Sequence, residues 1–186
     1  MFFRSVRANR RERARELPGD GLVPGAAVSA THAITIRRPR DEVWPWLVQM
    51  GGGRAGWYSY DFIDNGGNRS AERILPELQN IAVGSLLPSL PGATDGFVVH
   101  QYEPGRRLVL GHGPASNGAP LSTWTFVLEQ PAPDRTRLIV RGRLGLGRPG
   151  HRPYGLPPVL LRLVGPLGHF VMQRKQLLGI ARRAEG

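Results

Sequence analysis

Residues 34–47, ITIRRPRDEVWPWL, change within a few positions from the pattern of a strand to the pattern of a helix. Across residues 31–38 apolar and polar side chains alternate, with Ile34 and Ile36 on one face, which is the period of a half-buried strand. Pro39 has a backbone angle that suits the first turn of a helix, and Asp41 and Glu42 follow where the helix dipole favours acidic side chains. The sequence therefore predicts a strand that leads directly into a helix.

The predicted helix has an apolar stripe that ends at three glycines. The stripe consists of Val43, Trp44, Leu47, Val48 and Met50. A helix does not readily continue through residues 51–53, which are all glycine. Pro45 lies inside this helix, where it removes a hydrogen bond and is expected to kink the axis. Two further short helical segments are predicted near residues 57–63 and 70–78.

The second half of the chain predicts two antiparallel hairpins. Residues 97–102 and 107–112 flank a Glu-Pro-Gly-Arg turn, and residues 122–129 and 136–144 repeat the arrangement. In the second hairpin, alternation places on one apolar face Trp124, Phe126, Leu128, Leu138, Val140 and Leu144. It places on the other face, which we expect to be solvated, Thr123, Thr125, Arg137, Arg141 and Arg143. In residues 97–102 two assignments stay open, because Phe97 and Val99 compete with Val98 and Tyr102 for the interior.

Residues 159–183 contain the longest amphipathic helical pattern of the chain. Its apolar stripe is the natural cover for the apolar face of the strands: Leu160, Leu163, Leu167, Phe170, Val171, Leu177, Leu178 and Ile180. Gly165-Pro166 predicts a bend or a delayed beginning. The order of strand, helices, antiparallel strands and terminal helix predicts an α+β fold. We expect a single domain over residues 17–186, preceded by a basic tail, residues 1–16, that is solvated and partly disordered.

This order of elements resembles the SRPBCC superfamily, which includes START domains, polyketide cyclases and birch-pollen-allergen-like proteins. Four motifs carry the resemblance: residues 39–46 at the helix start, residues 49–51 running into 56–61, the hairpin turn 102–106, and residues 174–180 in the closing helix. The resemblance covers residues 17–185 and is to a bacterial branch without an assigned reaction. It implies a helix-grip fold, in which a curved antiparallel sheet wraps a long C-terminal helix, with short helices after the first strand. It also implies an internal cavity, but it does not imply an activity.

The net charge suggests an anionic partner, but the distribution of the charge does not. The 186 residues carry 25 Lys and Arg against 14 Asp and Glu, for a formal net charge of +11. Lys175 is the only lysine, and the arginines scatter except for clusters at residues 4–15 and 174–183. No basic recognition helix or aromatic-basic strand accompanies them. We therefore do not favour nucleic acid as a partner, and we keep peripheral membrane contact through the arginine-rich ends as an alternative.

Several classes of protein are excluded by what the sequence lacks. There is no cysteine, so disulfides, thiolate metal sites and cysteine nucleophiles are ruled out. The most apolar segment, residues 158–172, is interrupted by charged and helix-breaking residues, and the first residues lack the apolar core of a secretory signal. We therefore expect a cytoplasmic protein. Because metal-ligand spacing, a nucleophile elbow and a phosphate-binding loop are all missing, we expect no metal and no cofactor.

Large aromatic side chains gather around the predicted first helices. Six of them fall within residues 44–62, where they either line one end of a pocket or pack the core. With apolar residues of the strands and the last helix they form the predicted ligand-binding set: Trp44, Trp57, Tyr58, Tyr60, Leu108, Leu110, Trp124, Phe126, Val140 and Phe170. One helix does not fill a strongly curved sheet, so we expect a small lipophilic or aromatic ligand to occupy the remaining space.

Candidates for proton transfer are Asp61, Tyr58 and His100. Asp61 or the nearby Asp64 could act as a general base if it faced the interior beside a substrate. The alternative is that both aspartates cap a helix or hold a turn. His100 either pairs with His112 across a hairpin or faces solvent.

Three functions stay open at this point. The first is binding of a lipophilic ligand in the cavity, and the second is a polyketide cyclase-like or dehydratase-like reaction in the same place. The third is association with a membrane surface or nucleic acid through the arginine-rich ends.

Overall fold

The computed structural model describes residues 4–114, 119–145 and 158–186, without the side chains of residues 114, 158–167 and 169. Two short helices come first, α1 (Arg10–Ala14) and η1 (Asp20–Leu22). They are followed by β1 (Val28–Ile36), α2 (Arg40–Val48), α3 (Asp61–Asp64), η2 (Pro76–Leu78) and β2 (Leu86–Pro88). The chain ends with β3 (Gly96–Glu103), β4 (Arg107–Pro114), β5 (Pro120–Ala132), β6 (Arg135–Leu144) and α4 (Pro158–Glu185).

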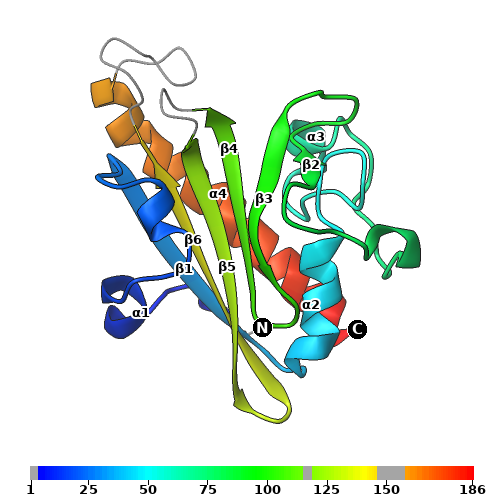
Figure 1. The fold of residues 1–186 in the computed structure, drawn as a ribbon. Coiled ribbons are helices and arrows are strands. Elements are labelled where there is room, and N and C mark those ends of the chain that lie inside the picture. Colours follow the sequence, from blue (N-terminus) through cyan, green and yellow to red (C-terminus); the bar gives the residue numbers. More distant parts are fainter. Residues whose placement is uncertain (1–3, 115–118, 146–157) are drawn as a thin grey trace.

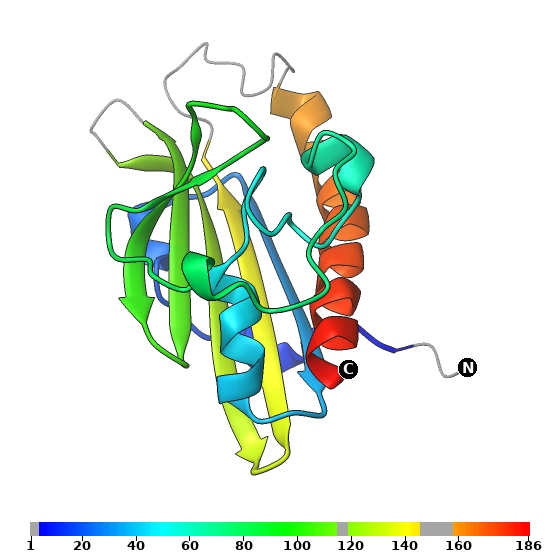
Figure 2. The ribbon, with the colours of Figure 1, turned by 90° about the vertical axis from the view of Figure 1, so that its right-hand side faces the viewer.

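The strands form a six-stranded antiparallel sheet in the order β1-β6-β5-β4-β3-β2. The first and last long strands pair along their whole length, from Val28 opposite Leu144 to Ile36 opposite Thr136. The long helix α4 lies across one face of the curved sheet, and α2 lies beside its C-terminal half (Figures 1 and 2). The predicted α+β helix-grip fold is therefore confirmed.

The strand-to-helix switch occurs at the predicted place. Pro39 is the residue at the helix N-terminus, and α2 begins at Arg40 with Asp41 and Glu42 in its first turn. Pro45 lies inside α2, as expected from the sequence. The two later helical segments are shorter than predicted, because α3 has four residues and η2 has three.

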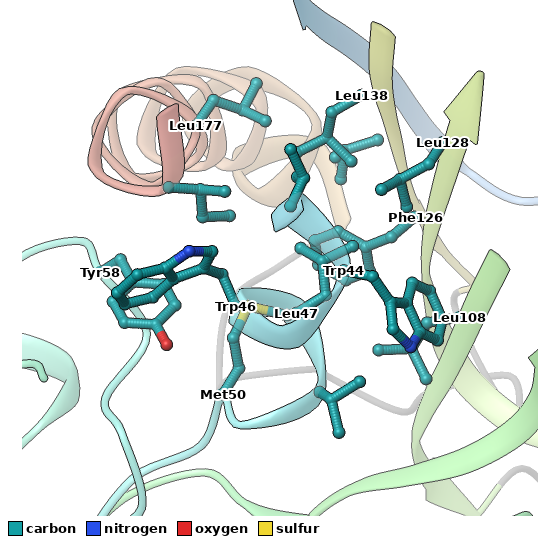
Figure 3. Close-up of a cluster of buried hydrophobic side chains, with 14 of the residues drawn as sticks. Trp44, Trp46, Leu47, Met50, Tyr58, Leu108, Phe126, Leu128, Leu138 and Leu177 are labelled. Carbon is teal, nitrogen blue, oxygen red and sulfur yellow. The ribbon is translucent and has the colours of Figure 1, made fainter. Parts of the chain in front are cut away.

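The main core fills one end of the space between sheet and helix. Figure 3 shows Trp46 and Leu47 of α2 between Leu177 of α4 and the strand residues Phe126 and Leu108. All five of these side chains are buried. Large inward-facing residues are paired across the strands at this end, as where Ile34 lies opposite Leu138 and Leu138 opposite Leu128. This end of the sheet is closed by ordinary core packing.

Much of the outer face of the sheet is covered, which corrects the predicted solvation of that face. Apolar and polar side chains alternate as predicted, but residues 8–22 pack over the polar face and bury Ala8 and Leu17 there, whereas Val6 joins the main core. Arg141 is only 4% exposed. Its guanidinium donates to the carbonyl oxygens of Glu12, Arg13 and Arg15 and pairs with Asp20 at 2.6 Å. Burial of a charge is tolerated when it is paired and fully hydrogen-bonded in this way.

The described part of the predicted basic tail, residues 4–16, is likewise ordered against the sheet. Arg7 forms an isolated bridge with His32 of β1, and Glu12 pairs with Arg137 at 2.8 Å. Asn9 caps α1 by a reciprocal capping box with Glu12. Arginines of both charged clusters bond within the chain: Arg4, Arg13, Arg15, Arg182 and Arg183. The sequence could not reveal most of this, because the partners of all these arginines except Arg13 are distant along the chain.

Two further points were open or wrong in the sequence analysis. Helix α4 begins at Pro158 and runs through Gly165-Pro166, so a delayed beginning is wrong. A bulge between Val99 and Gln101 resolves the competition within β3. It lets Phe97 and Val99 face the core before the bulge and Tyr102 face it afterwards.

Candidate functional site

A cavity of about 520 Å³ lies between the sheet and α4, at the end that the main core leaves unfilled. Its walls come from the starts of β1, β3 and β5, the end of β6, the middle of α4, and the segment around α3. They are mostly apolar. The lining residues are Val28, Ala30, Trp57, Ser59, Asp64, Ser89, Phe97, Ser122, Thr123, Trp124, Gly142, Arg143, Leu144, Met172, Gln173 and Gln176.

The cavity exists because two inward-facing strand positions carry small residues. Ala30 of β1 lies opposite Gly142 of β6, and Gly142 lies opposite Trp124 of β5. At the core end the corresponding positions hold Ile34 and Leu138. At the cavity end the methyl group of Ala30 and the hydrogen of Gly142 take the place of two large aliphatic side chains. No bulky side chain from these two positions fills the space between the sheet and α4. The space therefore follows directly from the sequence of β1 and β6.

Three aromatic rings make the opposite wall. The ring centres of Trp57, Phe97 and Trp124 lie 5.3 to 5.4 Å from one another. Phe126 and His112 extend this cluster along the sheet, at 5.1 Å from Trp124 and 5.2 Å from Phe97. Tilted and edge-to-face arrangements of this kind stabilise rings beyond their simple burial. The wall is therefore a rigid aromatic surface.

A tight glycine turn places Trp57 in this wall. Gly51 and Gly56 pair as an antiparallel bridge, and a side chain at Gly52 would lie 2.6 Å from the backbone of Leu90. Only glycine permits that close approach. The segment after the turn is then fixed by Trp57, whose Nε1–H donates to the carbonyl oxygen of Ser89 at 3.1 Å. The glycine run predicted as a helix end thus also positions a cavity residue.

The α4 side of the cavity is held by a line of hydrogen bonds. The Nε1–H of Trp124 donates to Oε1 of Gln173 at 2.8 Å, and the amide of Gln173 donates to Gln176 at 2.8 Å. Gln176 in turn donates to the sulfur of Met50 at 3.6 Å, a weak acceptor. Both glutamines are buried. They fix the indole of Trp124 relative to α4.

Asp64 and Arg143 are the ionisable residues among those that line the cavity. Asp64 ends α3, is 8% exposed, and has both carboxylate oxygens enclosed beside the hydroxyl of Ser59 and the backbone of Tyr60, which act to lower its pKa. Burial raises the pKa of Asp64 to about 6, and the neighbouring carboxylate of Asp61 adds to the rise. The preceding Ser59 donates to the carbonyl oxygen of Met172 at 3.1 Å, which pins this segment to α4. A carboxyl with a raised pKa therefore lies enclosed behind a largely apolar wall.

The three candidates for proton transfer lie outside the cavity lining. Asp61 accepts hydrogen bonds from the backbone and hydroxyl of Ser70, so it holds a turn. Tyr58 is buried in the core, where Gln49 donates to its hydroxyl at 2.8 Å and Arg183 lies over its ring. Burial raises the pKa of the Tyr58 phenol well above its ordinary value. His100 lies on β3 beside Gly111.

The predicted ligand-binding residues divide into three groups. Trp57 and Trp124 line the cavity. Six others belong to the core around it or beside it: Trp44, Tyr58, Leu108, Leu110, Phe126 and Val140. Tyr60 and Phe170 are 38% and 40% exposed; Tyr60 lies under Lys175, and Phe170 packs against His32.

Sequence reasoning missed the small and polar residues of the site. Ala30 and Gly142 are recognisable as small residues at inward positions of two strands, once those strands are paired. Gln173 and Gln176 are polar residues on the apolar stripe of α4, one turn apart, which is a signal that can be read from the helical period.

The described part of the chain shows neither a metal cluster nor a membrane-spanning helix. No group of three or more histidine, aspartate or glutamate side chains there is arranged to hold a metal ion. Likewise, none of its helices has the length and apolar character needed to cross a membrane.

The fold is shared with solved bacterial structures. Protein NE0264 of Nitrosomonas europaea is 12% identical, with a TM-score of 0.51, over 86% of this chain and 96% of that one. A Polyketide_cyc-like protein of Corynebacterium glutamicum is 16% identical, with a TM-score of 0.50, over 86% and 92%. The chain has the fold of these proteins. No protein-family model matches the sequence, and no curated protein matches it at the level of sequence.

Proposed function

We propose that the protein binds a small lipophilic or aromatic ligand in the cavity between the sheet and α4. The observation that carries this proposal is the cavity of about 520 Å³ with mostly apolar walls. Ligand sites commonly measure about 300–1,000 Å³ and combine apolar walls with few polar groups. Apolar surface removed from water contributes about 25 cal/mol per Å², so a ligand that covers the aromatic wall gains free energy by burial alone.

The proposal includes membership of the SRPBCC superfamily and a cytoplasmic location. The shared fold supports the first, together with the motif of residues 39–46, which forms the start of α2. The absence of cysteine fits a reducing compartment. Fold likeness does not identify a ligand, so the chemistry of the cavity has to do so.

Energy transfer from tryptophan to an anthracene probe tests the proposal. Trp57 and Trp124 line the cavity, so anthracen-9-ylmethanol bound there quenches tryptophan emission and gains emission of its own. We expect saturable binding with one site per chain, and native mass spectrometry gives the stoichiometry. Absence of saturable binding of this and other lipophiles would contradict the proposal.

A matched pair of variants locates the binding site. Ala30→Leu adds three carbon atoms at a cavity-lining position and is expected to weaken binding about ten-fold or more, by overlap with the ligand. Ser29→Leu adds an apolar side chain to the adjacent, exposed position of β1, which alternates to the other face. It is expected to leave binding unchanged. Equal effects of both variants would place the ligand elsewhere.

A second candidate function, proton transfer on a bound polyketone, is favoured by Asp64. A carboxyl with a pKa of about 6 beside a mostly apolar cavity suits abstraction of a proton next to a carbonyl group. Deuterium exchange at the central carbon of 1-phenylbutane-1,3-dione, followed by NMR, measures this step. The enzyme hypothesis predicts faster exchange with the protein than with Asp64→Asn. Equal exchange rates with both proteins would contradict proton transfer by Asp64 and leave ligand binding as the only proposed function.

A further inference from the structure

The segment around α3 carries large apolar side chains that the fold leaves in solvent. Phe62 is 89% exposed and Ile63 is 60% exposed, and the nearby Tyr60 is 38% exposed. We call these three residues the apolar tip. Single apolar residues on a protein surface need no explanation, whereas neighbouring large ones mark places of contact with another apolar surface.

Hydrogen bonds hold the apolar tip in this position. Asp61 accepts from the backbone and the hydroxyl of Ser70, and Asn65 and Asn68 each donate a side-chain N–H to the carbonyl oxygen of the other. Ser59 joins the segment to α4, and Figure 2 shows α3 beside that helix. The exposure of the tip is therefore built into the fold.

The apolar tip lies at the edge of the cavity. Ser59 and Asp64, on either side of Phe62 and Ile63 in the sequence, line the cavity, whereas Phe62 and Ile63 themselves lie in solvent. A side chain that is 89% exposed protrudes, so it forms no groove into which a helix or a strand of a partner protein could fit. A protruding apolar side chain suits insertion among lipid headgroups instead.

The charged residues near the tip favour an anionic lipid surface. Neither aspartate within residues 60–69 is exposed, whereas Arg69 is exposed at the end of that segment. Lys175 of α4 is also exposed, and its ammonium group lies 5.8 Å from the centre of the Tyr60 ring. Apolar side chains flanked by cations are typical of surfaces that bind anionic lipid. The formal charge of +11 attracts the same partner at longer range.

We propose that the apolar tip docks on an anionic lipid bilayer, with Phe62 and Ile63 among the headgroups and with Arg69 and Lys175 against lipid phosphates. This contact goes beyond ligand binding in the cavity and can be measured without any ligand. It differs from association through the arginine-rich ends, because arginines of both ends are bonded within the chain. The contact is reversible, since two side chains bury far less apolar surface than a spanning helix does.

Flotation of the full chain with lipid vesicles tests the inference. We expect binding to vesicles of equal parts phosphatidylcholine and phosphatidylglycerol, and binding at least about ten-fold weaker to phosphatidylcholine alone. Phe62→Ser and Ile63→Ser should each weaken binding about ten-fold, because the lost side chain no longer leaves water. Val83→Ser is the matched control, since Val83 is 66% exposed in the turn before β2, and it is expected to leave vesicle binding unchanged.

Phe62→Trp measures insertion directly. Lipids brominated on their acyl chains quench a tryptophan that enters the bilayer. The added tryptophan should therefore be quenched, whereas the four tryptophans of the wild-type protein, which are buried or half-buried, should not be.

Three results would overturn the inference: equal vesicle binding of Ile63→Ser and the wild-type protein, an equal loss of binding in Val83→Ser, or no additional quenching in Phe62→Trp. Failure of the wild-type chain to bind either kind of vesicle would overturn it as well. None of these results bears on the cavity, because binding of the anthracene probe is measured in solution without lipid.

Discussion

Replacing Asp64 by asparagine should make the protein more stable at alkaline pH. The folded protein raises the pKa of Asp64 from its ordinary value of 3.8 to about 6, because burial disfavours the charged form. The folded state therefore holds the proton more tightly than the unfolded state. The associated stabilisation is fully present below about pH 4 and is lost as the pH rises through about 6. At pH 8 the wild-type protein carries a buried carboxylate close to the carboxylate of Asp61.

The size of the effect follows from the shift in pKa. One pKa unit corresponds to about 1.4 kcal/mol, so the rise from 3.8 to about 6 amounts to at most about 3 kcal/mol. Asp64 lines a cavity rather than solid core, and the polar groups of Ser59 and Tyr60 offset part of the burial, so we expect Asp64→Asn to gain about 1 to 3 kcal/mol at pH 8. For a chain of this size each kcal/mol raises Tm by about 2–4 °C. At pH 4 the free energies of unfolding of the two proteins should agree within about 0.5 kcal/mol, because the carboxyl of Asp64 in the folded wild-type protein is then largely neutral.

Urea unfolding and thermal melts at pH 4, 6 and 8 measure this difference. Asp61→Asn is the control with the opposite sign, because its carboxylate accepts two hydrogen bonds from Ser70. Weakening those bonds should cost about 0.5–1.5 kcal/mol each at most. A loss of stability on Asp64→Asn at pH 8, or a gain that is the same at pH 4 and pH 8, would refute the reasoning.

Two further substitutions test other parts of the structure. Arg141→Met removes the guanidinium that lies 2.6 Å from Asp20 and leaves only that of Arg143 at 3.9 Å, so it should cost about 3 kcal/mol. It should also open residues 4–22 to proteolysis, whereas Arg135→Met, at an exposed position of the same strand, should stay within about 0.5 kcal/mol. Resistance of the Arg141→Met chain to nicking would argue against the packed N-terminal segment. Gln173→Met leaves the indole N–H of Trp124 unpaired and should cost about 1–3 kcal/mol, read from urea unfolding.

The sequence predicted most of the fold because the deciding signals are local. The alternation in β5 and β6, the turn between β3 and β4, and the proline before α2 each act within a few residues. The three-residue strand β2 escaped prediction, since a segment of that length has no detectable period. The packing of residues 4–22 escaped for a different reason, because it depends on Arg137 and Arg141 more than one hundred residues away.

The candidate site was predictable only in part. Trp57 and Trp124 were expected in the cavity wall because large aromatic residues are conspicuous in a sequence. The cavity itself arises from Ala30 and Gly142, whose importance appears only when β1 and β6 are paired in register. Asp61 and Asp64 look equivalent in the sequence, and only the fold separates a turn residue from a residue of the cavity wall.

A crystal structure of the protein with anthracen-9-ylmethanol tests the account most directly. The account predicts density for the ring system against Trp57 and Trp124, beneath α4. Density on the outer surface alone, or a cavity closed by side chains of α4, would contradict it.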